Sequence, residues 1–145
     1  MVETKSTSAV VIDTLNALLE AEENSIFRFM GEGSPYLSRA TAEIRRPLND
    51  MVIAGQQRVL DLADMIDRMG GIPKPGSIQS EEQYLAFLTI KFLMPKLIEA
   101  QKVAIERYEN ALTALKNGPA EVVELLKKHL SEHERNLKTL LHAAG

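Results

Sequence analysis

Four polar residues lie on the otherwise apolar faces of four predicted helices, and their side chains could do chemistry together. They are Glu22, Arg58, Gln101 and His133. A carboxylate and an imidazole are metal ligands, whereas a guanidinium can bind a carboxylate through two parallel hydrogen bonds. Because a buried carboxylate needs a partner, we expect Arg58 to pair with Glu22 and all four residues to form one buried polar cluster.

Each member of this cluster also has a purely structural interpretation, and the sequence leaves these alternatives open. Glu22 could be solvated at the edge of its helix, Gln101 could be a hydrogen-bonded core amide, and His133 could be a core histidine with satisfied ring nitrogens. If any metal binds, Glu22 and His133 are the candidate ligands. His129 and His133, four residues apart on one helix, are a further candidate pair.

Two other residues lie at the same height along the predicted helices as these four and are unusual there. Gly55 lies in the middle of the apolar face beside Arg58, where a glycine costs about 1 kcal/mol relative to alanine. It either allows two helices to approach closely or leaves space beside Arg58. Tyr108 lies on an apolar face, and we expect it in the core with its hydroxyl on a polar neighbour.

The composition predicts a single domain that needs no disulfide. The chain has 145 residues, 45% hydrophobic and 26% charged, and no cysteine, so it can bury a core of its own but offers no thiolate ligand or nucleophile. A net charge of −3 gives no cationic field for nucleic acid or anionic lipid. No apolar run approaches the roughly 20 residues of a membrane span. We therefore expect a cytoplasmic protein that binds neither nucleic acid nor membranes.

Apolar residues that recur at three- and four-residue steps predict four amphipathic helices. The expected helices cover 8–30, the segment that ends at Met69, 81–116 and the chain after Pro119. The second helix either begins near Ala40 and bends at Pro47 or begins at Pro47 itself, and Pro95 is expected to interrupt the third.

The last helix has a clear expected apolar stripe. This stripe consists of Val123, Leu126, Leu130, Leu137 and Leu140. His133 occupies the vacant step between two of these leucines. His129 and Glu132 lie away from the centre of the stripe, so we expect solvent beside them.

Glycines and prolines fill residues 71–80, which are expected to form a long connection and not a tight turn. Four helices with one long connection predict an all-α fold, a four-helix bundle with a crossover between the second and third helices. Residues 1–7 are expected to be a disordered tail, and residues 8–145 one domain.

Three short sequence motifs resemble those of the ferritin-like superfamily of the rubrerythrin and bacterioferritin type. The second predicted helix ends in RVLDLADMIDRMGGIP, which is similar to the phrase H-A-x-x-L-x-x-x-I-x-x-x-G-G-x-P. The third contains QKVAIERY, similar to E-x-x-A-I-x-x-Y, and the last contains HLSEHERNL, similar to E-x-x-H. The resemblance covers most of the chain and implies the ferritin-like bundle.

Diiron members of that superfamily hold their metals with one glutamate from each of two helices and with Glu-x-x-His from the other two. The resemblance implies that two of these six positions keep a ligand here, Glu22 and His133. The other four positions carry Gly55, Arg58, Gln101 and Leu130. A neutral amide is a poor substitute for a carboxylate, and a guanidinium adds positive charge where a cation would sit. We therefore expect no diiron centre and no cofactor.

The expected function is that of a non-catalytic ferritin-like protein with a degenerate metal site, acting as a structural or interaction module. We expect a homo-oligomer that forms through helix faces. Such a contact would use apolar residues outside the main stripes, namely Val10, Ile53, Leu60, Phe87 and Ile90. The alternative is a small-molecule or single-metal binding protein that uses the bundle centre, with residual redox or iron-related function.

Overall fold

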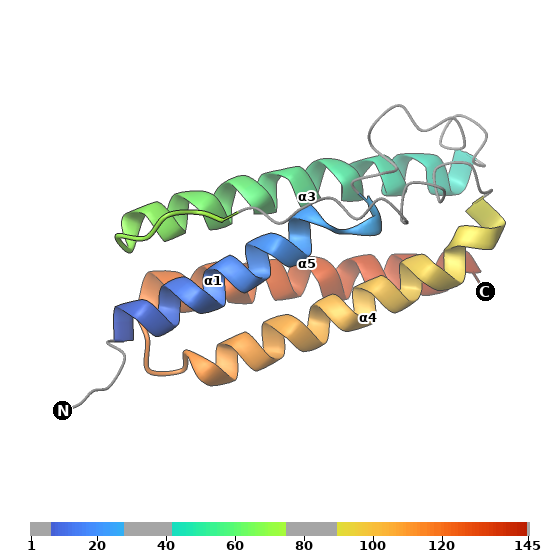
Figure 1. Ribbon diagram of the computed structural model, residues 1–145. Coiled ribbons are helices and arrows are strands. Elements are labelled where there is room, and N and C mark those ends of the chain that lie inside the picture. Colours follow the sequence, from blue (N-terminus) through green and yellow to red (C-terminus); the bar gives the residue numbers. More distant parts are fainter. Residues whose placement is uncertain (1–6, 28–41, 75–89, 145) are drawn as a thin grey trace.

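Four long helices form an antiparallel bundle (Figure 1). The computed structural model describes residues 7–27, 42–74 and 90–144. The helices are α1 (Thr7–Glu23), α3 (Ala42–Arg68), α4 (Ile90–Ala114) and α5 (Ala120–Ala144). Over these described ranges the chain contains no strand. The predicted all-α four-helix bundle is therefore confirmed.

The helices α3 and α4 start at the same end of the bundle, so the connection between them has to cross its length (Figure 1). Residues 71–74 begin this crossing alongside α1. Asn16 Nδ2 donates a hydrogen bond to Ile72 O at 3.3 Å, and Asn16 Oδ1 accepts one from Lys74 N at 2.7 Å. One side chain of α1 thus ties down the start of the predicted crossover.

A glycine pair ends α3. Gly70 has a φ of +86°, and its N–H donates to Asp67 O at 3.0 Å while Gly71 N–H donates to Ile66 O at 2.9 Å. This is the Schellman arrangement, which satisfies the last carbonyls of a helix. Gly71 also lies against α1, since a Cβ at this position would stand 2.7 Å from Ile12 Cγ2. The chain therefore needs glycine at both positions.

The first helix is shorter than predicted and ends at Glu23. Side chains after it bond to the backbone: Asn24 Nδ2 donates to Glu20 O at 3.1 Å, and Ser25 Oγ accepts from Phe27 N at 3.3 Å. Serine and asparagine favour such local bonds over a continued helix. The two residues after Ser25 are helical again, so the serine acts as the cap of a new turn.

Two interior prolines lie within helices. Because α3 begins at Ala42, before Pro47, the earlier of the two predicted starts is correct. The predicted interruption at Pro95 is wrong, since α4 continues through it. Pro95 is on the exposed side of α4, where water can bind the carbonyl that a proline leaves free. The predicted residues 81–89 of this helix and 1–6 of the tail lie outside the described ranges.

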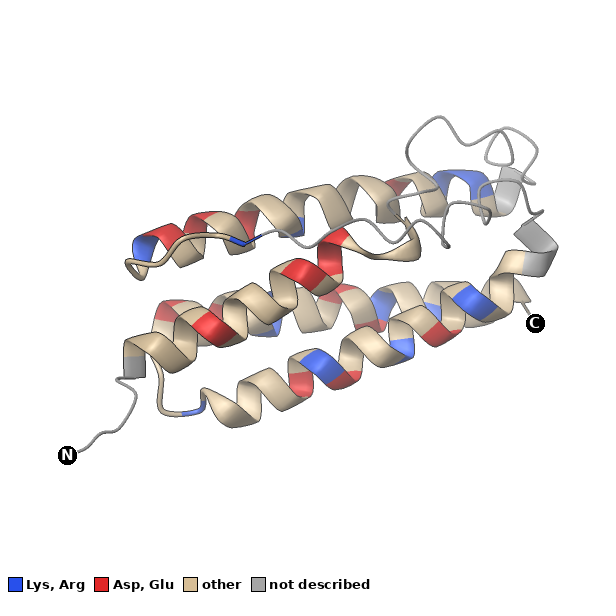
Figure 2. Ribbon diagram, viewed as in Figure 1, with Lys and Arg blue, Asp and Glu red and all other residues tan. Residues whose placement is uncertain are grey.

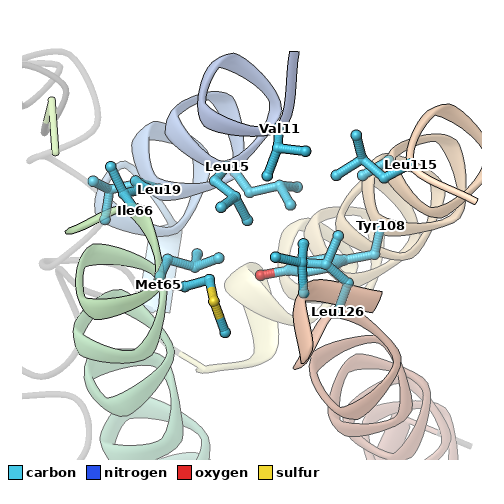
Figure 3. Close-up of a cluster of buried hydrophobic side chains, with 12 residues drawn as sticks. Val11, Leu15, Leu19, Met65, Ile66, Tyr108, Leu115 and Leu126 are labelled. Atoms are coloured by element: carbon cyan, nitrogen blue, oxygen red, sulfur yellow. The ribbon is translucent and has the colours of Figure 1, made fainter. Parts of the chain in front are cut away.

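Two apolar clusters fill the interior, one towards each end of the bundle. The first contains Ile26, Phe27, Ile44, Leu48, Met51, Val52, Leu93, Leu97 and Leu140. The second contains Val11, Leu15, Leu18, Leu19, Leu62, Met65, Ile66, Tyr108, Ala111, Leu115, Val122 and Leu126. Figure 3 shows part of the second cluster, with the hydroxyl of Tyr108 pointing from α4 into the space between the helices. None of the described helices is both long and apolar enough to cross a membrane.

Candidate functional site

The polar residues that the sequence singled out lie between the two apolar clusters and contact one another. Glu22, near the end of α1, is at the centre. Its Oε2 accepts hydrogen bonds from Arg58 Nε at 3.0 Å and from His133 Nε2 at 2.8 Å. His133 Nδ1 lies 2.6 Å from Gln101 Oε1. All four side chains are buried, and each comes from a different helix.

Tyr108 also contacts the Glu22 carboxylate. Its hydroxyl donates a third hydrogen bond to Glu22 Oε2, at 2.8 Å. The phenol ring also packs between two imidazoles, with its centroid 5.3 Å from that of His133 and 5.7 Å from that of His129. Tyr108 therefore links the apolar cluster of Figure 3 to the polar centre.

The structure corrects the predicted buried face of α5. The buried residues are Val122, Leu126, His129, His133 and Leu140. Val123, Leu130 and Leu137, which were expected at the centre of the stripe, are only half-buried. The helix is turned towards its histidines because both imidazoles find hydrogen-bond partners inside, which removes the main cost of burying a polar group.

Glu132 belongs to the same centre, so the prediction that it faces solvent is wrong. Arg58 Nη1 donates a hydrogen bond to Glu132 Oε1 at 2.9 Å. The guanidinium thus bridges two carboxylates, that of Glu22 through Nε and that of Glu132 through Nη1. Sequence reasoning missed this contact because Glu132 lies off the leucine stripe, and only the reach of an arginine brings the two residues together.

His129 was also expected in solvent, but its side chain is fully buried. Its Nδ1 lies 3.2 Å from the Tyr108 hydroxyl, and its Nε2 lies 3.2 Å from Asp61 Oδ2 on α3. Burial lowers the pKa of His129, and the hydrogen bond to Asp61 opposes this only in part. The ring is therefore neutral at neutral pH, with Nε2–H donating to Asp61 and Nδ1 left as an acceptor. The Tyr108 hydroxyl has one proton, which it donates to Glu22 Oε2, so its approach to Nδ1 is a polar contact and not a second full hydrogen bond. A chain of polar contacts thus runs from Asp61 to Gln101.

The charged side chains at the centre are paired with one another by direct contacts. Burial would raise the pKa of Glu22, but the His133 hydrogen bond and the Arg58 charge outweigh it and hold the pKa at about 2. Burial would lower the pKa of Arg58, but Glu22 and Glu132 raise it. Burial and the charge of Glu22 raise the pKa of Tyr108 well above its ordinary value. At neutral pH the centre therefore holds an ionised carboxylate, a guanidinium and a protonated phenol.

Both ring nitrogens of His133 face oxygen atoms, one of Glu22 and one of Gln101. A doubly protonated ring donates to both. A neutral ring fits only when the Gln101 amide is turned so that its nitrogen donates to Nδ1. In either arrangement the second polar atom of the Gln101 amide makes no hydrogen bond with the described residues.

Two cavities reach this centre. A groove of about 670 Å³ lies between α1 and α4, and its lining includes Glu22, Gln101, Tyr108 and His133. A smaller cavity of about 210 Å³ lies between α1 and α3 beside Gly55. A Cβ at Gly55 would meet only Arg58 Nη2, at 3.5 Å, which is an ordinary contact. Of the two predicted roles, the glycine therefore has that of leaving space beside Arg58.

The diiron centre of the superfamily does not fit the residues at its ligand positions. The donors at these positions are one carboxylate, one imidazole and one neutral amide, and the guanidinium of Arg58 already lies 3.0 Å from the Glu22 carboxylate. Iron in such a site needs several anionic oxygen donors to offset its charge. In the part of the chain that the structure describes, no group of three or more His, Asp or Glu side chains is arranged to hold a metal ion.

Comparison with known proteins shows the fold. No protein-family model and no curated protein sequence matches this chain. The structure is similar to that of the bacterioferritin of Desulfovibrio desulfuricans, solved with its diiron site in different catalytic states, with a TM-score of 0.79 and 18% identity over 95% of this chain and 80% of that one. It is also similar to ferritin-like diiron-carboxylate proteins from Bacillus anthracis, with a TM-score of 0.71 and 18% identity over 98% and 100% of the two chains. The chain has the ferritin-like fold, as the sequence phrases predicted.

Acid should destabilise the protein through Glu22. Because the folded-state pKa of about 2 lies below the ordinary value of 4.5, the unfolded chain takes up the proton first. The stabilisation is present above pH 4.5 and is lost as the pH falls towards 2, by roughly 3 kcal/mol. Urea unfolding between pH 7 and 2.5 measures this loss. Glu22→Gln should lack it and the exposed Glu20→Gln should keep it, and equal pH slopes in all three proteins would contradict the assignment.

Removing Arg58 alone should lower the unfolding free energy more than removing Arg58 and the charge of Glu22 together. Arg58→Met leaves the Glu22 carboxylate buried without its counter-ion, and we expect a loss of about 3–5 kcal/mol of unfolding free energy. Adding Glu22→Gln should restore most of it, because the fully buried charge is then gone and Glu132, the other partner of Arg58, is partly exposed. Arg68→Met, which removes an exposed pair with Asp64 on the same helix, should cost under about 1 kcal/mol. A double variant no more stable than Arg58→Met would refute the pairing.

Proposed function

We propose that this protein is a non-catalytic ferritin-like bundle that has lost the diiron centre and acts as a structural or interaction module. The observation that carries the proposal is the contact of Arg58 Nε with Glu22 Oε2 at 3.0 Å in the middle of the bundle. The guanidinium supplies the positive charge that the buried carboxylate requires. His133 Nδ1 and Gln101 Oε1 are paired with each other, so neither of these two atoms is free to bind a metal.

The surface of α3 supports self-association as the mode of interaction. Ile53 and Leu60 are 55% and 62% exposed, the highest values for large apolar side chains in the described helices. They are seven residues apart and therefore lie on one face, two turns apart. Of the other predicted contact residues, Val10 is less exposed, at 37%, and Phe87 and the side chain of Ile90 lie outside the described part of the chain.

Charged residues flank this apolar pair with opposite signs. The exposed stripe of α3, here called the α3 stripe, consists of Arg46, Asn49, Ile53, Gln56, Gln57, Leu60, Asp64 and Asp67. Figure 2 shows basic residues at the start of α3 followed by one acidic residue, a largely uncharged middle, and an acidic last part that ends on the basic Arg68. A stripe with this order is complementary to itself when a second copy runs in the opposite direction.

A two-fold axis through the middle of the α3 stripe would place apolar residues opposite apolar ones and basic residues opposite acidic ones. Ile53 would lie opposite Leu60 of the second copy, and Arg46 opposite Asp67 of the second copy. A two-fold contact repeats each pair by symmetry, so it buries four apolar side chains and forms two ion pairs. We therefore propose an antiparallel contact between two α3 helices as the interface of a homodimer.

The loss of the diiron centre is tested by metal content. Protein purified without chelator and then incubated anaerobically with Fe²⁺ should hold well under one metal per chain by elemental analysis, because Arg58 repels a cation. A variant with Gly55→Glu, Arg58→His, Gln101→Glu and Leu130→Glu restores the six donors that the resemblance implies. It should bind more iron than the natural chain. Two iron atoms per natural chain would overturn the proposal.

The α3 interface is tested by sedimentation velocity over a range of concentrations. Leu60→Glu should weaken the dimer at least about tenfold, because it places a charge in the apolar middle of the contact. Leu141→Glu changes an exposed leucine of α5 and should have no effect. A natural chain that stays monomeric at high concentration would refute self-association.

A charge exchange tests the antiparallel direction of the contact. Arg46→Asp and Asp67→Arg should each weaken the dimer, since each places like charges opposite one another. The two changes together should restore it, because the ion pair is re-formed with its signs reversed. Additive weakening in the double variant would show that the two positions do not face each other.

A further inference from the structure

The imidazole of His133 is held between two oxygen atoms from different helices. Its Nε2 lies 2.8 Å from Glu22 Oε2 on α1, and its Nδ1 lies 2.6 Å from Gln101 Oε1 on α4. All three side chains are buried, so these contacts are shielded from water. Because carboxylate oxygens and amide oxygens accept hydrogen bonds, this arrangement belongs to a ring that is protonated at both nitrogens.

A doubly protonated His133 also balances the charges of the centre. The charged and titratable side chains around its ring come from all four helices and are Glu22 of α1, Arg58 of α3, Tyr108 of α4, and His129 and Glu132 of α5. With His133 protonated, two cations stand beside two carboxylates. Loss of the second proton leaves one of these negative charges without a counter-ion.

His133 is the member of the centre that can change its protonation near neutral pH. Burial would raise the pKa of Glu22, but the hydrogen bond from His133 and the charge of Arg58 hold it at about 2. Burial and the charge of Glu22 raise the pKa of Tyr108 well above its ordinary value. Burial lowers the pKa of His129, so that ring takes up a second proton only in acid.

Loss of one proton from His133 reverses what the ring requires of Gln101. Because Glu22 is ionised, the remaining proton stays on Nε2, and Nδ1 becomes an acceptor. Gln101 Oε1 would then face a lone pair, whereas a half-turn of the amide about its last bond brings an N–H of Nε2 to Nδ1. This torsion is broad and two-fold, and the two ends of an amide are nearly alike, so the half-turn needs no change in packing.

The geometry points to Gln101 as a pH-operated switch. Its amide accepts a hydrogen bond from the charged ring of His133 and donates one to the neutral ring, so the contact between α4 and α5 persists in both states. The amide atom that does not contact His133 changes at the same time, from an NH₂ group to a carbonyl oxygen. This explains the residue type at position 101, because a glutamate has no proton to give to the neutral ring and an apolar side chain can neither accept nor donate.

NMR of the ¹⁵N-labelled natural chain between about pH 5 and 8 tests the switch. His133 Nε2 should stay protonated throughout, while Nδ1 loses its proton as the pH rises. The side-chain NH₂ signals of Gln101 should shift with the same midpoint, and above it a hydrogen-bond coupling should connect Gln101 Nε2 with His133 Nδ1. Gln56, which is exposed on α3, is the control and should show no such midpoint. A Gln101 amide that does not follow His133, or a ring that keeps both protons over this range, would overturn the inference.

Two variants distinguish the switch from a purely structural role of Gln101. Gln101→Glu can only accept, so His133 should keep its second proton to a pH higher by about one unit or more. Gln101→Met offers no hydrogen bond, and His133 should lose that proton at a lower pH than in the natural chain, because the charged ring loses an acceptor. Circular dichroism checks that both variants fold. Equal midpoints of His133 in the natural chain and in the folded variants would refute the inference. It goes beyond self-association, and either can fail without the other because sedimentation does not report on the amide.

Discussion

A single carboxylate oxygen fixes how four helices meet. Glu22 Oε2, on α1, accepts hydrogen bonds from Arg58 on α3, Tyr108 on α4 and His133 on α5. A sliding or turning of any one helix would break a bond to a buried charge, which costs far more than the loss of an apolar contact. Ion pairs of this kind add little net stability compared with an apolar core. Their effect here is to define one register of the helices.

The type of the cation follows from the geometry. The guanidinium of Arg58 donates from two different nitrogens to two carboxylates that come from α1 and α5. The single ammonium of a lysine cannot offer two separated donors in a fixed plane. Gly55, one turn before Arg58, leaves open space where a side chain would contact Nη2. In the proposed view, a rigid planar cation has replaced a metal as the charge that the inward carboxylate needs.

Sequence reasoning found the parts of this centre that interrupt apolar stripes. Glu22, Gln101 and His133 each stand at a step where the helical period requires an apolar residue, and that signal is local. The fold was predictable for the same reason, because four stripes and one long connection leave few architectures. Arg58, at the edge of its stripe, was found because a buried carboxylate requires a cation.

The missed parts depend on information that a single helix does not contain. Asp61 and Glu132 join the network only because side chains on other helices reach them. His129 was misplaced because Val123, Leu130 and Leu137 suggested a different buried face of α5, and the true face differs by less than a quarter turn. The end of α1 is a different case, because it depends on local hydrogen bonds from the side chains of Asn24 and Ser25 to the backbone, which apolar periodicity does not detect. The spacing of apolar residues gives the approximate buried face of a helix, but hydrogen-bond partners on the other helices decide its final rotation.

The three hydrogen bonds of Glu22 converge on one of its two oxygens. Arg58, Tyr108 and His133 all donate to Oε2. Contacts to three helices therefore depend on the position of a single atom, and a change that moves this atom weakens all three hydrogen bonds together. A metal centre would distribute the same task over several carboxylates and two ions. In this bundle one buried anion and the donors around it take that place, so the order of the core depends on keeping Glu22 ionised.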